Sequence, residues 1–108
     1  MALTRNFRET ILARAERDAA FRAQMLREAV ANLLNGDVDA GKGMLRDYIN
    51  ATLGFERLAE ATGKPAKSLH RMLGSSGNPT LDSFVLILKA LQKFEGIDLA
   101  VSTRRRAT

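Results

Sequence analysis

Residues 54–73 read GFERLAEATGKPAKSLHRML and contain two short amphipathic segments on either side of Gly63-Lys64-Pro65. Glycine readily takes the left-handed conformation that ends a helix, and proline is compatible with the opening of the next one. In the first segment, small and apolar residues recur at the spacing of one helical face. The sequence therefore predicts two short helices, over residues 55–62 and 66–73, joined by a tight turn.

The two sides of the second predicted helix differ in character. Leu69, Met72 and Leu73 fall on one side and are expected to point into the core. Because each residue turns the helix by about 100°, Lys67 and Arg71 lie one turn apart on the opposite side. The pattern predicts an exposed basic ridge, which we define as Lys67 and Arg71.

A basic ridge on a short helix suits DNA. An α-helix fits the major groove of B-DNA, and a partner helix that lies over the backbone fixes its orientation. Ala59, on the inner face of the first helix, is small enough for the two helices to approach closely. Lys67 and Arg71 are then natural readers of bases or phosphates. The alternative is a plain helical hairpin whose lysine and arginine side chains are only solvated.

Helical periodicity also runs through the N-terminal half of the chain. A first helix is predicted over residues 6–16, and Asp18 is a candidate N-cap for a second helix that the Asn35-Gly36 pair ends. A third helix follows either Asp37 or Asp39 as its cap. Its apolar face carries Met44, Leu45, Tyr48 and Ile49.

The C-terminal third begins with a loop over residues 74–79. Thr80 is a good N-cap for a helix over residues 81–94, which Gly96 ends. Residues 97–101 alternate large apolar residues with small or polar ones, as a short strand does.

Together these elements predict an all-α fold, a compact bundle of about six helices with a short C-terminal strand. Its one structural domain has three parts: a helical extension packed on the core (1–48), the helix-turn-helix DNA-binding region (49–96), and the strand with a basic tail (97–108).

The composition favours a polyanionic partner without establishing one. The 108 residues carry a net charge of +5, and Arg104, Arg105 and Arg106 supply three of those charges. A basic surface that is only solvated would give the same value. No apolar run approaches the roughly 18 residues of a membrane span, so we expect a cytoplasmic protein with no membrane partner.

The residues that most catalytic and metal sites need are scarce. The chain has no cysteine, and its single histidine, His70, cannot form a zinc site alone. No carboxylate or nucleophile stands one turn away from His70. Asp37 and Asp39 are interpreted as helix caps rather than metal ligands. We therefore expect no enzyme activity, no catalytic residues, no metal and no cofactor.

Three motifs, in order along the chain, resemble a known family. They are residues 54–63, residues 68–73 and the GNPTL segment at residues 77–81. They resemble the Xre-type, lambda repressor-like helix-turn-helix family, and more narrowly its addiction-module antidote branch, over about residues 49–94. The resemblance implies a sequence-specific repressor that binds double-stranded DNA and, as an antitoxin, has a cognate toxin as a second partner.

The resemblance also implies which residues face DNA. The helix over residues 66–73 would enter the major groove. Phe55 stands where many members carry a phosphate-binding glutamine, and Pro65 where they carry a serine or threonine cap. We interpret Phe55 as a core residue. The predicted DNA-binding residues are Lys64, Ala66, Lys67, Ser68, His70, Arg71, Ser75 and Asn78.

The predicted helix over residues 81–94 has apolar residues on two sides. The second side, which includes Ile87, meets either the N-terminal helices or another subunit. A two-fold homodimer would let two short helices read half-sites about 34 Å apart, and the strand could then pair with its two-fold mate or with a toxin. A competing hypothesis is a helical protein-interaction module that keeps this shape without binding DNA. The predicted dimer interface consists of Leu86, Ala90, Phe94, Ile97 and Leu99.

Overall fold

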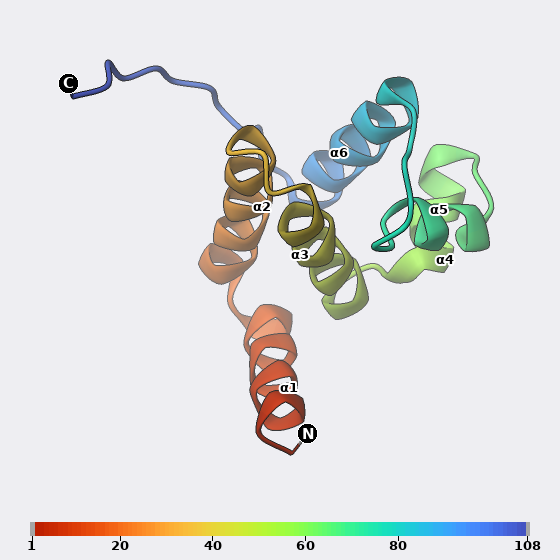
Figure 1. Cartoon of the computed structure of the whole chain (residues 1–108). Coiled ribbons are helices and arrows are strands. Elements are labelled where there is room, and N and C mark those ends of the chain that lie inside the picture. The colour runs from red at the N-terminus through yellow and green to blue at the C-terminus, as the bar shows by residue number, and fades with distance from the viewer. Residues whose placement is uncertain (1, 108) are drawn as a thin grey trace.

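A computed structural model of the chain describes residues 2–107, with the side chains of residue 7 and residues 9–107. Six α-helices follow one another, and residues 2–107 contain no strand, so the predicted all-α class is confirmed. Figure 1 shows α1 projecting from a body formed by the other five helices. The helices are α1 (Ala2–Arg17), α2 (Ala19–Leu34), α3 (Val38–Ala51), α4 (Gly54–Thr62), α5 (Ala66–Met72) and α6 (Leu81–Glu95).

Side-chain caps fix where three of the helices begin. The carboxylate of Asp18 accepts the backbone N–H of Phe21 at the start of α2, and this bond holds the pKa of Asp18 below its ordinary value. Asp37, rather than Asp39, caps α3. Thr80 caps α6, as predicted.

The core is built around α3, which packs against α1, α2 and α4. Tyr48 at its centre is fully buried, together with Leu45 and Ile49 on the same face. Met44, on the same predicted face, is half-buried and packs against this core. Every other helix adds at least one fully buried side chain to the same cluster: Ala15, Leu26, Ala29, Leu58, Leu69, Ile87 and Leu91.

A partly buried polar network lies at the edge of the core, where α2, α3 and α6 meet. The Nε of Arg22 donates to both carboxylate oxygens of Glu95, at 3.0 and 3.1 Å, and its Nη1 donates to the carbonyl of Ala15. The hydroxyl of Tyr48 donates to Oε1 of Glu95 at 2.6 Å. The bonds to Glu95 raise the pKa of Arg22 above its ordinary value. The network ties the end of α6 to the N-terminal helices.

Tyr48 gives the fold a predicted pH dependence. Burial first, and then the bond to Glu95, raise the pKa of the Tyr48 phenol well above its ordinary value. The folded protein keeps this proton above about pH 10, whereas the unfolded chain releases it, so the free energy of unfolding falls as the pH rises through this range.

Tyr48 is the only tyrosine and the chain has no tryptophan. Ultraviolet absorbance of tyrosinate should therefore appear only as the protein unfolds, and Tyr48→Phe should remove this part of the alkaline loss of stability. A tyrosinate signal near pH 10 from the folded protein would contradict the expectation.

The predicted C-terminal strand is wrong. Residues 97–101 have no regular secondary structure. Ile97 and Leu99 are half-buried against the core, which explains the alternating pattern. Their backbone N–H groups bond to the carbonyl and the side-chain oxygen of Gln92, so they are satisfied by α6 rather than by a neighbouring strand.

Candidate nucleic-acid interface

α4 and α5 meet at the turn predicted from Gly63. Gly63 has a φ of 72°, in the left-handed region, and its N–H donates to the carbonyl of Ala59 at 2.8 Å. Pro65 follows in an extended conformation, and its carbonyl accepts the N–H of Leu69. The sequence turns the chain here because glycine ends α4 and proline opens α5, as expected.

The faces of α5 are those the spacing predicts. Leu69 and Leu73 are fully buried and Met72 is half-buried. Lys67 and Arg71 are both exposed on the opposite side. The structure therefore presents the basic ridge to solvent and leaves it uncovered by the rest of the described chain.

The other predicted DNA-binding residues divide into two groups. His70, Ser75 and Asn78 are exposed. Lys64, Ala66 and Ser68 are half-buried, because they lie in the turn or on the flank of α5 toward the body. All eight predicted residues belong to one continuous segment, residues 64–78, which consists of the turn, α5 and the loop after it.

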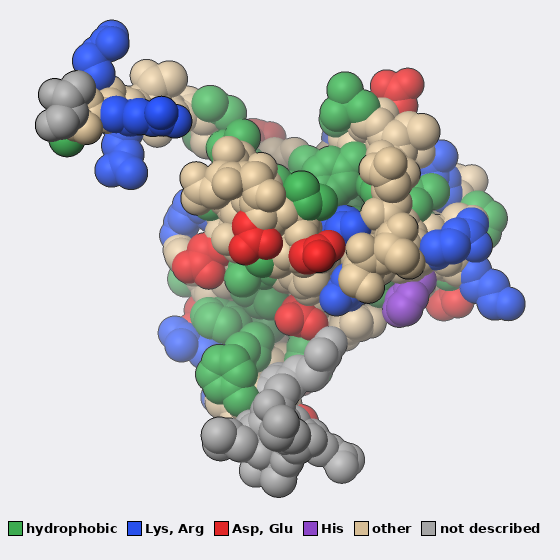
Figure 2. Space-filling model, viewed as in Figure 1, with side chains coloured by type: hydrophobic (Ala, Val, Ile, Leu, Met, Phe, Trp, Pro, Cys, Tyr) green, Lys and Arg blue, Asp and Glu red, His purple; other side chains and the backbone are tan. Residues whose placement is uncertain are grey.

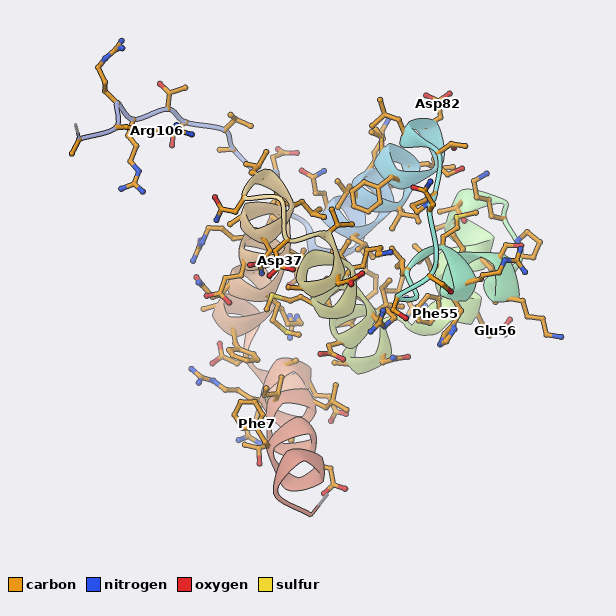
Figure 3. All side chains as sticks on the ribbon, in the orientation of Figure 1. Phe7, Asp37, Phe55, Glu56, Asp82 and Arg106 are labelled. Carbon is orange, nitrogen blue, oxygen red and sulfur yellow. The ribbon has the colours of Figure 1, made fainter. Side chains whose placement is uncertain are left out.

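Phe55 joins the two helices of the pair. Its ring lies on α4, half-buried against the core, and its centroid is 5.0 Å from that of His70 on α5, with the planes tilted by 60°. Phe55 thus has the packing role expected of it, and it also supports a residue of the predicted interface. Figure 3 labels Phe55 and its neighbour Glu56 at the α4–α5 end of the molecule.

The surface around the ridge is mixed but mainly basic. Figure 2 shows lysine and arginine side chains gathered at the α4–α5 end, beside the single histidine. Arg57 of α4 is also exposed, and its guanidinium lies 5.2 Å from the centre of the Phe94 ring. Glu56 and Glu60 add two exposed carboxylates on α4. The basic tail leaves the body on the side away from α5, as Figure 1 shows.

The loop after α5 is held by residues that the sequence reasoning missed. Lys42, on α3, donates from Nζ to the carbonyl of Gly77 at 2.7 Å, and Arg46 donates to the carbonyl of Leu73. Lys42 is 3% exposed. The sequence does indicate that these two cations face inward, because both fall at helical spacing from Leu45 and Ile49 on the buried face of α3.

The predicted dimer residues lie on α6 and just beyond it. Leu86 and Phe94 keep 37% and 39% of their surface exposed. Ala90, Ile97 and Leu99 are half-buried against the chain's own core. The two apolar sides predicted for α6 do not separate in the structure, because Ile87 from one side and Leu91 from the other are both fully buried in the core of the same chain. The interface itself stays a prediction.

Comparisons with family models, curated proteins and solved structures return no significant match. The resemblance to repressors therefore stays a prediction. In the described part of the chain, no group of three or more potential metal-ligating side chains comes together. No helix among residues 2–107 has the length and apolar character of a membrane span.

Proposed function

We propose that this chain is a sequence-specific DNA-binding transcriptional repressor in which α5 enters the major groove. The observation that supports this most directly is the exposed basic ridge of Lys67 and Arg71, on a short helix that Gly63 turns against α4. Both side chains are long enough to reach base edges, and arginine pairs well with guanine in the major groove.

The neighbouring residues suit the same role. His70 lies beside the ridge, and Ser75 and Asn78 follow in an exposed loop that can contact the phosphate backbone. The net charge of +5 adds attraction toward a polyanion that does not depend on sequence. α4 would lie across the backbone and set the orientation of α5.

We further propose that the repressor is a cytoplasmic antitoxin, which binds DNA as a homodimer and has a toxin as its protein partner. It rests on the resemblance of residues 49–94 to the antidote branch of the Xre-type family. A two-fold pair of chains would read two half-sites and so extend the sequence that is recognised.

A helical protein-interaction module is the second candidate function. The observation in its favour is a set of large apolar side chains left exposed on α3 and α6. Val38 and Val85 are about half exposed and Leu81 is 77% exposed. Surfaces of this kind bind proteins when they are contiguous.

The test is a gel-shift titration of the chain against its own promoter fragment and a scrambled fragment of the same length. We expect preferential binding of the promoter, and weaker binding to both fragments as the salt concentration rises. Equal affinity for the two fragments would reject sequence-specific repression. No binding to either fragment at low salt would favour the protein-interaction module.

A further inference from the structure

The loop that follows α5 is held against the end of that helix by backbone hydrogen bonds and close packing. Gly74 donates its N–H to the carbonyl of Arg71, and Gly77 donates to the carbonyl of Gly74 at 2.9 Å, so the loop folds back on the end of the helix. The Cα of Gly77 is so close to the last turn of α5 that a Cβ would lie 2.5 Å from the carbonyl oxygen of Met72. The loop and the helix end therefore form one unit.

Two cations on α3 hold this unit in place. The Nζ of Lys42 bonds to the carbonyl of Gly77 and lies 3.9 Å from a carboxylate oxygen of Asp39. Arg46, one turn further along α3, bonds to the carbonyl of Leu73 at the end of α5. A cation is also favourable at this position because the carbonyl end of a helix carries partial negative charge. We refer to Lys42 and Arg46 as the loop clamp.

Apolar packing leaves the loop partly unsupported on the side that faces α3 and α6. Gly77, Asn78 and Pro79 border an open hollow of about 260 Å³ between the loop and the starts of α3 and α6. On this side the polar bonds of the clamp position the loop, whereas on the other side Gly77 rests on the last turn of α5. A buried ammonium group is expensive to desolvate, and this cost offsets much of what its hydrogen bond to Gly77 contributes to the stability of the fold. The bond from Lys42 therefore contributes more to the position of the loop than to the stability of the fold.

The clamp also sets the direction of the loop amides. In a trans peptide the C=O and the following N–H point in opposite directions, and the described chain has no cis peptide. Because the carbonyl of Gly77 points toward α3, the N–H of Asn78 points away from α3. By the same reasoning the N–H of Ser75 points away from Gly77, since the carbonyl of Gly74 faces Gly77. Backbone N–H groups of this kind are common phosphate donors in DNA complexes.

We propose that Lys42 and Arg46 are positioning residues for DNA binding, which act through the loop of residues 74–78 and do not touch DNA themselves. The inference rests on the proposed function. It assigns the loop to a contact with the phosphate backbone and gives α3 the role of holding that contact in register with α5.

The principal variant is Lys42→Met, which keeps an unbranched side chain and removes the charge and the donor. The matched control is Lys89→Met, which removes the same charge from an exposed site on α6. We expect Lys42→Met to weaken binding to the promoter fragment by about tenfold, or roughly 1.4 kcal/mol, and the control by less than about twofold. Because phosphates carry no sequence information, the loss should be similar for promoter and scrambled DNA.

Two further measurements separate positioning from general stabilisation. In the free protein, amide exchange at Gly77 should be faster in Lys42→Met than in the control, while exchange in α2 is unchanged. In a double-mutant cycle, Asn78→Ala keeps the backbone N–H but removes the exposed side-chain amide, which is also predicted to contact DNA. It should weaken DNA binding less in the Lys42→Met background than in the wild type, because the whole loop is then displaced from the phosphate backbone. Additive losses in this cycle would overturn the inference.

The outcomes also separate this inference from the proposed function. If the wild type binds the promoter and folded Lys42→Met binds as well as Lys89→Met, the clamp has no positioning role but the repressor proposal stands. If the wild type binds no DNA, both fail. Should Lys42→Met not fold, Arg46→Gln decides, because Arg46 is only half-buried. It is expected to lose about threefold in affinity while remaining folded, and unchanged affinity in that variant would overturn the inference.

Discussion

Replacing Lys67 and Arg71 together by alanine is expected to weaken binding to the promoter fragment by at least about a hundredfold, since each base or phosphate contact contributes roughly 1–3 kcal/mol. Helicity and the midpoint of thermal unfolding should hardly change. Both side chains are exposed, no hydrogen bond or ion pair within the described residues is assigned to either, and alanine is a good helix former. Fluorescence anisotropy with labelled promoter DNA and circular dichroism would measure the two effects.

The matched control is the Lys89→Ala and Lys93→Ala pair, which removes two exposed charges from α6. It lowers the net charge equally, so it should reproduce only the general electrostatic part of the loss. If the two double variants lose the same affinity, α5 does not enter the groove. Arg71→Ala alone then separates base reading from phosphate contact, because only the loss of a base contact relaxes the preference for one sequence.

Gly77→Ala is expected to destabilise the fold by roughly 2–4 kcal/mol, through overpacking against backbone. The added methyl group would overlap the carbonyl oxygen of Arg71 and lie 2.7 Å from the carbonyl carbon of Met72. These are backbone atoms at the end of α5, and they cannot rotate away as a flexible side chain can. Thermal unfolding should show a midpoint lower by about 10 °C or more.

Ser76→Ala is the control for this substitution. Ser76 is the neighbouring loop residue and is exposed, so its loss should change the free energy of unfolding by less than about 0.5 kcal/mol. A Gly77→Ala variant as stable as Ser76→Ala would show that the loop does not rest on the last turn of α5 as described.

Local signals in the sequence predict much of the fold. Asp18 and Thr80 cap helices, and Gly63 and Gly96 end them in the left-handed conformation, because each of these choices depends on a few neighbouring residues. The inward and outward faces of α5 follow from helical spacing alone. The first helix begins at Ala2 rather than near Asn6, since the limits of a helix depend on weak interactions at its ends.

The long-range polar contacts could not be predicted in the same way. The bond from Lys42 to Gly77 joins residues 35 positions apart, and the bond from Tyr48 to Glu95 joins residues 47 apart. Periodicity places Lys42 on the buried face of α3 but does not say which carbonyl it meets. The prediction of a strand over residues 97–101 was wrong because it too depended on a long-range contact. An alternating pattern also arises when an irregular segment packs on a core.

The brevity of α5 limits how much information one chain can extract from DNA. Its seven residues span about 10 Å along the axis, which corresponds to about three base pairs of B-DNA. Three fully specified base pairs carry about six bits, whereas singling out one site among about a million requires about twenty. If the proposed function holds, one chain alone could not recognise a unique DNA site. Further copies of the chain or contacts to flanking base pairs would have to supply the remaining sequence information.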